Sequence, residues 1–172
     1  GFIQTTPIQL CLMTAQIANG GYKIYPKIVL DDDKKYNDKF TPLYKKSRNI
    51  KIVQDAMFSS TNELRGTSYR SRLDDPKYQF AGKTGTSQVK KITERDRELD
   101  LKTFQIPYEE RDHALYVAFG PYKNPRYALS IIIEHGGSGG TVAAPLAKEL
   151  FKKVIDRHEI RKNYDNKKYL DI

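Results

Sequence analysis

The sequence predicts an α+β fold in which an antiparallel sheet of three strands is covered by helices. A helix-capping signal stands near the start of the chain. In the second half of the chain, two runs of successive apolar residues flank a short turn. A glycine-rich connection then leads into a last helical segment. These observations give the order helix, helix, strand, strand, strand, helix. The 172 residues are enough for one domain, and a domain of this size buries a core of its own.

The first helix is predicted to begin at Thr6–Gln9. A hydroxyl residue, a proline and a glutamine stand there in the order of a capping box with proline at the first helical position. The sequence Asn19–Gly21 predicts that the helix ends in a left-handed cap. Apolar residues at helical spacing predict the face that it buries: Ile8, Cys11, Leu12, Ala15 and Ala18.

The charged residues 30–51 are predicted to form a mobile surface segment. The run Asp31–Asp33 in this segment lacks the spaced acidic residues, the glycine and the distal glutamate of a calcium loop. A second helix is predicted from about Val53 to Leu64, with its end at Gly66. Three of its residues are expected to face inward: Ala56, Met57 and Ser60.

Three strands are predicted, at Tyr78–Val89, Ala114–Gly120 and Tyr127–Glu134. The turn Pro121–Arg126 makes the last two strands antiparallel neighbours, and their consecutive apolar residues predict cover on both faces. A sheet of three strands leaves an edge strand whose unpaired backbone groups could pair with a further strand. The charged connection at 90–112 is long for a compact domain, and connections of this length are often functional.

The sequence Gly136–Gly140 leads into the last helix. Leu146, Leu150 and Val154 recur at helical spacing, which predicts that they form its buried face. We expect the domain to cover residues 1–157. Residues 158–172 are predicted to be a polar, frayed tail.

The formal net charge of +9 raises the possibility of a nucleic-acid partner. Basic residues interleave with acidic ones, however, and the twelve tyrosines form no alternating aromatic and basic strand. A solvated surface is therefore predicted, and no nucleic-acid partner. Cys11 stands alone, which excludes an internal disulfide, and it shares no ligand spacing with the histidines. We therefore expect no metal site and no other cofactor.

The stretch with the most chemical information is Lys83-Thr84-Gly85-Thr86, within the first predicted strand. It supplies a cation, hydroxyl groups and, at the glycine, a backbone that a substrate can approach closely. Acyl-transfer sites need these three properties. A Lys-Ser/Thr-Gly triplet occurs by chance in about one chain in ten of this length, so the residues around it decide its meaning.

Those residues resemble a known family, the class B penicillin-binding proteins. From Gly1 to about Asp156 the chain is similar to the carboxyl-terminal half of their transpeptidase domain, and most similar to the penicillin-binding protein 2 subfamily of peptidoglycan D,D-transpeptidases. The resemblance rests on the order and spacing of several motifs: Gly1–Gln9, Asn19–Gly21, Gly66-Thr67, Ala81–Gln88, Ile106–Tyr108, Arg111–His113, Ala118–Tyr122, Asn124-Pro125 and Glu134–Gly137.

The resemblance implies a serine acyl-transfer mechanism. A serine attacks the penultimate D-Ala carbonyl of a peptidoglycan stem peptide, D-Ala leaves, and an amine of a neighbouring strand resolves the acyl-enzyme into a cross-link. β-Lactams are trapped at the same step. The family pattern implies that the ammonium of Lys83 assists proton transfer and sets the local potential, and that the Thr84 hydroxyl and Gly85 belong to the site. The Thr86 hydroxyl is expected to bind the substrate carboxylate, and the Thr86 N–H to stabilise the oxyanion.

The resemblance also implies a place and partners for the longer parent protein. We expect the parent at the periplasmic face of the bacterial inner membrane, anchored by a segment upstream of Gly1. Its expected partners are stem peptides, β-lactam antibiotics and proteins of the elongation machinery. No apolar run within the 172 residues approaches the length that spans a bilayer.

The family nucleophile belongs to a Ser-x-x-Lys motif at the start of a helix, and a Ser-x-Asn motif follows it. Three mimics occur here: Ser87–Lys90, Ser47–Asn49 and Ser60–Asn62. Ser87 and Lys90 fall on a predicted strand, where they would point to opposite faces. Ser47 falls in the charged surface segment, and Ser60 is predicted to pack within the second helix. We therefore expect this chain to be catalytically incomplete.

Alternative functions follow from the same residues. A D,D-carboxypeptidase or a serine β-lactamase would share the Lys-Thr-Gly strand, and a non-catalytic module would use the basic surface to bind an acidic polymer or a protein. His113 beside Asp112 could be an oriented base, but a surface histidine is the preferred interpretation. Gly136–Gly140 could cradle a phosphate, but it lacks the Walker lysine and is interpreted as a tight connection.

Overall fold

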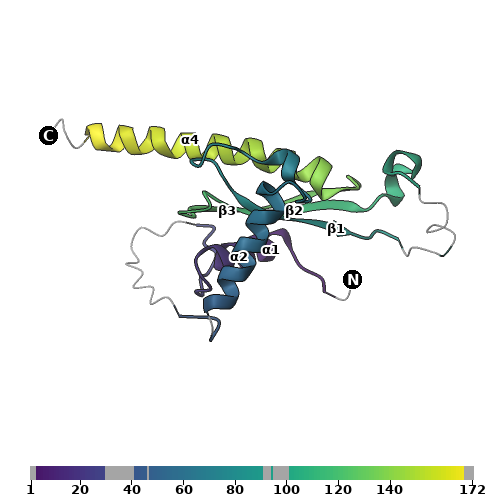
Figure 1. The fold of residues 1–172 in the computed structure, drawn as a ribbon, viewed down its shortest axis with the longest axis horizontal. Helices are drawn as coiled ribbons and strands as arrows, with labels where there is room; N and C mark the ends of the chain where they lie inside the picture. Colours follow the sequence, from purple (N-terminus) through teal and green to yellow (C-terminus); the bar gives the residue numbers. More distant parts are fainter. Residues whose placement is uncertain (1–2, 30–40, 46, 91–93, 95–100, 169–172) are drawn as a thin grey trace.

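The computed structural model describes residues 3–29, 41–45, 47–90, 94 and 101–168 (Figure 1). In the described residues the three strands form one antiparallel sheet in the order β1-β2-β3. The helix α4 lies on one side of this sheet, and α1 and α2 lie on the other (Figure 1). The α+β class and the predicted order of elements are confirmed. The main elements are α1 (Pro7–Ala18), α2 (Ser47–Asn62), β1 (Ala81–Ser87), β2 (His113–Gly120), β3 (Tyr127–Ile133) and α4 (Ala144–Lys168).

The capping box of α1 is present as predicted. The Thr6 hydroxyl accepts a hydrogen bond from the Gln9 N–H at 3.4 Å, and the Gln9 side-chain oxygen accepts one from the Thr6 N–H at 2.8 Å. The prediction for Ile8 was wrong, because its side chain is exposed. The later turns of α1 make the contact with the sheet: the Cys11 thiol donates to the Ala128 carbonyl of β3, and Ile17 packs on the core of that face.

Helix α2 begins at Ser47, earlier than predicted. The end of the segment predicted to be mobile is therefore helical, and Ile50 is buried. The rest of that prediction, at 30–40, lies outside the described residues. Met57 is buried and Ser60 half-buried as predicted, but Ala56 is exposed. The buried stripe runs instead through Ile50, Met57 and Thr61, which share a helical face at spacings of seven and four.

The strands β2 and β3 lie within one residue of their predicted bounds, and β1 is shorter than predicted at both ends. Antiparallel pairing sets Lys83 opposite Val117, and Val117 opposite Ser130. Between β1 and β2, two short 3-10 helices lie at Thr103–Gln105 and Tyr108–Glu110.

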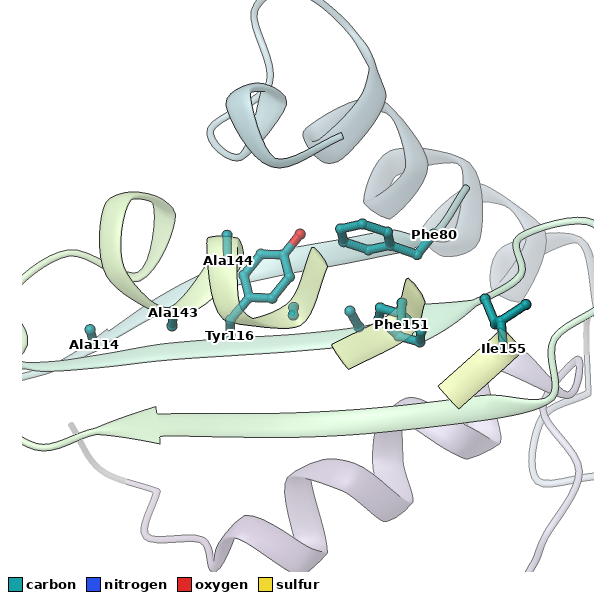
Figure 2. Close-up of a cluster of buried hydrophobic side chains, with 9 residues drawn as sticks. Phe80, Ala114, Tyr116, Ala143, Ala144, Phe151 and Ile155 are labelled. Carbon is teal, nitrogen blue, oxygen red and sulfur yellow. The ribbon is translucent and has the colours of Figure 1, made fainter. Parts of the chain in front are cut away.

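The larger part of the core lies between the sheet and α4, where Phe80 stacks on Phe151 with ring centroids 4.9 Å apart (Figure 2). The prediction that Leu146 and Leu150 form the buried face of α4 was wrong, because each is 45% exposed. A stripe of small residues with two large ones is buried instead: Ala143, Ala144, Ala147, Phe151 and Ile155. Alanines let the helix axis lie close to the strands, whereas leucines would hold it away.

Helix α4 enters through a π-helical turn at Gly139–Ala143 and continues to Lys168. Residues 158–168, predicted to be a frayed tail, are therefore helical, and the side chains after Arg161 are not described. Asp156 ties α4 to the segment before β1: it accepts hydrogen bonds from the Tyr78 hydroxyl at 2.5 Å and from the Lys77 ammonium at 3.0 Å. Among the described residues, no helix combines the length and the apolar character that a membrane crossing requires.

The tie at Asp156 should make part of the stability depend on pH. The hydrogen bonds from Tyr78 and from Lys77 lower the pKa of Asp156 below its ordinary value. The contribution of the ionised Asp156 to the free energy of unfolding is therefore complete above the ordinary carboxyl pKa of about 3.9. It is lost as the pH falls through the lower pKa that Asp156 has in the folded state. We expect wild type to lose unfolding free energy more steeply than Asp156→Asn between about pH 4 and about pH 2, measured by urea unfolding.

The control for this experiment is Asp74→Asn, which changes an aspartate whose side chain is 83% exposed and lies 3.0 Å from the Arg72 guanidinium. Exposed ion pairs of this kind contribute little to stability. Parallel pH dependences for wild type and Asp156→Asn would contradict the assignment.

Candidate functional site

The residues Lys83, Thr84, Gly85 and Thr86 lie on β1, which is at one edge of the three-stranded sheet. Successive side chains of a strand point to opposite faces. Lys83 is paired with Val117, which packs on the side of α1 and α2, and Thr84 is paired with Tyr116, which packs on the side of α4. The motif therefore presents groups to both faces and along the edge between them.

The Lys83 side chain is exposed and follows the edge of β1. Its ammonium donates to the Thr84 carbonyl at 2.8 Å and lies 3.4 Å from the Thr84 hydroxyl. Within the described part of the chain it has no carboxylate partner. The cation is thus available at the edge of the sheet and is not part of a packed interior.

Lys83 also lines an apolar groove of about 430 Å³ on the face of α1 and α2. The other lining residues come from the two helices and from β2: Met13, Ile17, Ile52, Val53, Ala56, Met57, Ser60 and Val117.

The backbone of Thr86 supplies a donor at the same edge. In an antiparallel strand the N–H and C=O of one residue point to the same side, and the direction alternates along the chain. The Thr84 carbonyl accepts from the Lys83 side chain on the free side of β1. Thr86, two residues further on, therefore directs its N–H to that free side. Its hydroxyl is on an exposed residue.

Tyr116 lies directly behind the motif, and its buried hydroxyl was not found by sequence reasoning. The ring is fully buried, and its hydroxyl lies 2.9 Å from the hydroxyls of both Thr61 and Ser68 (Figure 2 shows the ring among the core residues). Burial raises the pKa of Tyr116, and the hydrogen bonds with Ser68 and Thr61 offset part of that rise. A Cβ at Gly82 would lie 2.2 Å from this hydroxyl, so Gly82 gives Tyr116 its space.

Ser60 and Thr67 also join the site, although neither was assigned a role in it. The Thr67 hydroxyl lies 3.2 Å from the Thr84 hydroxyl and 3.1 Å from that of Ser60. The hydroxyls of α2, of the turn at Gly66–Ser68 and of β1 thus form a chain. The only signal in the sequence was the Gly66-Thr67 pair ahead of the strand.

The three motif mimics lie elsewhere. Ser87 ends β1, and Lys90 pairs with Glu110 at 2.6 Å. Ser47 is the first residue of α2, which begins within the segment predicted to be mobile. In the third mimic Asn62 has a structural role, because its amide donates to the carbonyls of Phe58 and Phe80.

The remaining candidates are held by structural contacts. The His113 Nδ1 accepts the His135 N–H at 2.9 Å, and the Asp112 carboxylate accepts the Val89 N–H at 3.2 Å. Gly139 packs against β2, where a Cβ would lie 2.2 Å from the Leu115 carbonyl oxygen. In the described ranges, no group of three or more His, Cys, Asp or Glu is arranged to hold a metal ion.

Comparison with known proteins shows which family the chain belongs to. The model of the penicillin binding protein transpeptidase domain matches residues 1–152. The chain belongs to the penicillin-binding protein transpeptidase family. The three strands packed against helices correspond to the fold of that domain in solved structures.

The relatives of this chain include the peptidoglycan D,D-transpeptidases MrdA of Salmonella typhimurium and Acinetobacter baumannii. The first is 34% identical over 164 residues, which are 91% of this chain and 26% of the relative. The second is 35% identical over 159 residues, which are 88% of this chain and 22% of the relative. The chain therefore spans about a quarter of the length of these relatives.

Two solved structures of penicillin-binding protein 2 are also similar. The protein from Pseudomonas aeruginosa, in complex with WCK 5153, is 32% identical with a TM-score of 0.68, over 89% of this chain and 31% of that one. The protein from Helicobacter pylori, in complex with MreC, is 27% identical with a TM-score of 0.68, over 88% of this chain and 25% of that one.

The contact between Gly82 and Tyr116 can be tested by Gly82→Ala. The added methyl group has no room beside the Tyr116 hydroxyl, and overpacking of this kind costs about 1–3 kcal/mol. We expect the free energy of unfolding to fall by that amount in urea titrations. Gly85→Ala is the matched control on the same strand, because its methyl would meet only the Leu115 side chain, at 3.2 Å. Equal stability of the two variants would contradict the contact.

Proposed function

We propose that this chain is the carboxyl-terminal part of a peptidoglycan D,D-transpeptidase that cross-links stem peptides through a serine acyl-enzyme and binds penicillin. The observation that carries the proposal is the free edge of β1, where the Lys83 ammonium, the Thr84 hydroxyl and the Thr86 N–H lie along one strand. Membership of the transpeptidase family and the MrdA relatives support it.

In this proposal each group of the edge contributes to substrate binding or to catalysis. The Lys83 ammonium provides positive potential for the substrate carboxylate and assists proton transfer at the acylated serine. The Thr84 hydroxyl lies within the site beside Lys83, and the Thr86 hydroxyl receives the carboxylate. The Thr86 N–H stabilises the oxyanion, and one donor of this kind is worth about 3 kcal/mol in comparable sites. At Gly85 the absence of a side chain lets the peptide lie close to the strand.

We further propose that the nucleophile comes from residues outside these 172. The sequence contains one Ser-x-x-Lys, at Ser87–Lys90, and Ser87 is on a strand while Lys90 pairs with Glu110. A serine and a lysine that exchange a proton need the shared face that a helix gives to positions three apart. The chain alone is therefore proposed to be catalytically incomplete.

The partners of the parent protein are proposed on the same basis. Relatives have been solved with MreC and with WCK 5153. We propose that the parent binds proteins of the elongation machinery and β-lactams at the periplasmic face of the inner membrane, in addition to stem peptides. A transpeptidase differs from a D,D-carboxypeptidase in its acceptor, so transfer of the acyl group to an added D-amino acid would distinguish them.

The catalytic role of the edge can be tested by labelling the full-length parent with a fluorescent penicillin. Lys83→Ala removes the cation that assists proton transfer, and we expect the acylation rate constant to fall by about 100-fold or more. Thr84→Val removes one hydroxyl and should lower it by about tenfold. The matched control is Lys123→Ala, which removes an exposed lysine from the turn between β2 and β3. Unchanged labelling of both edge variants would contradict the proposal.

The isolated 172-residue chain should form no covalent penicillin adduct. The serine that penicillin acylates and the lysine paired with it are proposed to belong to the parent protein and to lie outside these 172 residues. Intact-mass spectrometry after incubation with penicillin should show the unmodified mass, with the labelled full-length parent as positive control. A stoichiometric adduct that maps to Ser87 would contradict the assignment of the nucleophile.

A further inference from the structure

A chain of three hydroxyls ends at the proposed site. It connects Ser60 of α2, Thr67 of the following turn and Thr84 of β1, with oxygen separations of 3.1 Å and 3.2 Å. The Lys83 ammonium stands at the Thr84 end, 3.4 Å from that hydroxyl. Thr67 is thus the link between the strand that carries the proposed site and the helix behind it.

The donor is fixed only at the Lys83 end of this chain. An ammonium group only donates, whereas a hydroxyl donates one hydrogen bond and accepts two. Thr84 therefore accepts from Lys83, whereas in the Thr84–Thr67 and Thr67–Ser60 pairs either hydroxyl can be the donor. If Thr84 donates to Thr67 and Thr67 donates to Ser60, the three bonds run in one direction. Hydrogen bonds aligned in one direction polarise each other and hold each hydroxyl in one orientation.

Thr67 is placed by its neighbours in the turn. The Gly66 N–H donates to the Glu63 carbonyl at 2.8 Å, and the Ser68 N–H donates to the Ser60 carbonyl at 3.0 Å. The Ser68 side chain is buried and bonded to the Tyr116 hydroxyl of β2 at 2.9 Å. With its backbone tied to α2 and to the sheet on either side, the exposed Thr67 side chain is held opposite Thr84.

We propose that Thr67 is a positioning residue that orients the Thr84 hydroxyl, so that Thr84 donates a second hydrogen bond to the substrate carboxylate that the Thr86 hydroxyl receives. In the unliganded site Thr84 accepts from Lys83 and donates to Thr67. When a carboxylate arrives, Thr84 turns its proton to the anion, and Thr67 turns its own proton to Thr84. A hydroxyl at position 67 serves both states because it both donates and accepts. This inference rests on the proposed function of Lys83 and Thr84.

The test labels the full-length parent with fluorescent penicillin and compares two substitutions of Thr67, one that removes the hydroxyl and one that keeps it. Thr67→Val keeps the shape and removes the hydroxyl, and the loss of one hydrogen bond to Thr84 should lower the second-order acylation rate constant by about three- to tenfold. Thr67→Ser keeps the hydroxyl and should restore the rate to within about twofold of wild type. Thr41→Val, at an exposed threonine on another part of the chain, is the matched control.

A double-mutant cycle separates positioning from general damage. If Thr67 acts through Thr84, Thr67→Val should have no further effect in a Thr84→Val background, so the two losses do not add. Thermal unfolding of each variant shows whether it is folded at the assay temperature. Additive losses, or a Thr67→Ser variant as slow as Thr67→Val, would overturn the proposal.

The outcomes also separate this inference from the proposed function. If Lys83→Ala and Thr84→Val acylate normally, the proposed function fails, and this inference fails with it. If those two variants are slow and Thr67→Val acylates at the wild-type rate, the positioning role alone is overturned.

Discussion

The contact on which the site depends is that of the Tyr116 hydroxyl with Thr61 and Ser68, behind Gly82. Tyr116 is fully buried on β2, and its hydroxyl reaches α2 and the turn after it with two hydrogen bonds of 2.9 Å. A buried hydroxyl without partners would cost about 1–3 kcal/mol. The two partners therefore fix where α2 and its turn lie relative to the sheet, and Gly82 is the only kind of residue that fits over this contact.

This arrangement resolves a conflict at the edge of the sheet. A substrate strand can approach β1 only if that edge stays unpaired, yet unpaired edges are mobile and invite aggregation. Here the strand is held from behind, through Tyr116 beneath Gly82 and through Thr67 at Thr84, and within the described residues no strand pairs with its outer edge. Lys83 lies along the same edge, and a lysine there also discourages pairing with another chain.

The sequence predicted those structural elements correctly whose signal lies in residues close together along the chain. The capping box at Thr6 and Gln9 and the apolar runs of β2 and β3 depend on neighbouring residues, and they were predicted correctly. Buried helix faces were less predictable. Leucine is more apolar than alanine, so periodicity favoured Leu146 and Leu150, but the distance between α4 and the sheet suits Ala143 and Ala147. That distance is a tertiary property, and no window of sequence contains it.

The same reasoning explains what could be predicted of the site. Lys83, Thr84, Gly85 and Thr86 are consecutive, so they were visible as a motif, although their roles remain proposals. Thr67 and Tyr116 lie far from them along the chain, and only the pairing of Tyr116 with Thr84 and the turn after α2 bring them together. Threonine, serine and tyrosine are common residues, and those whose hydroxyls meet from distant parts of the sequence have no distinctive spacing. Their contribution to an active site therefore becomes apparent only when the strand register is known.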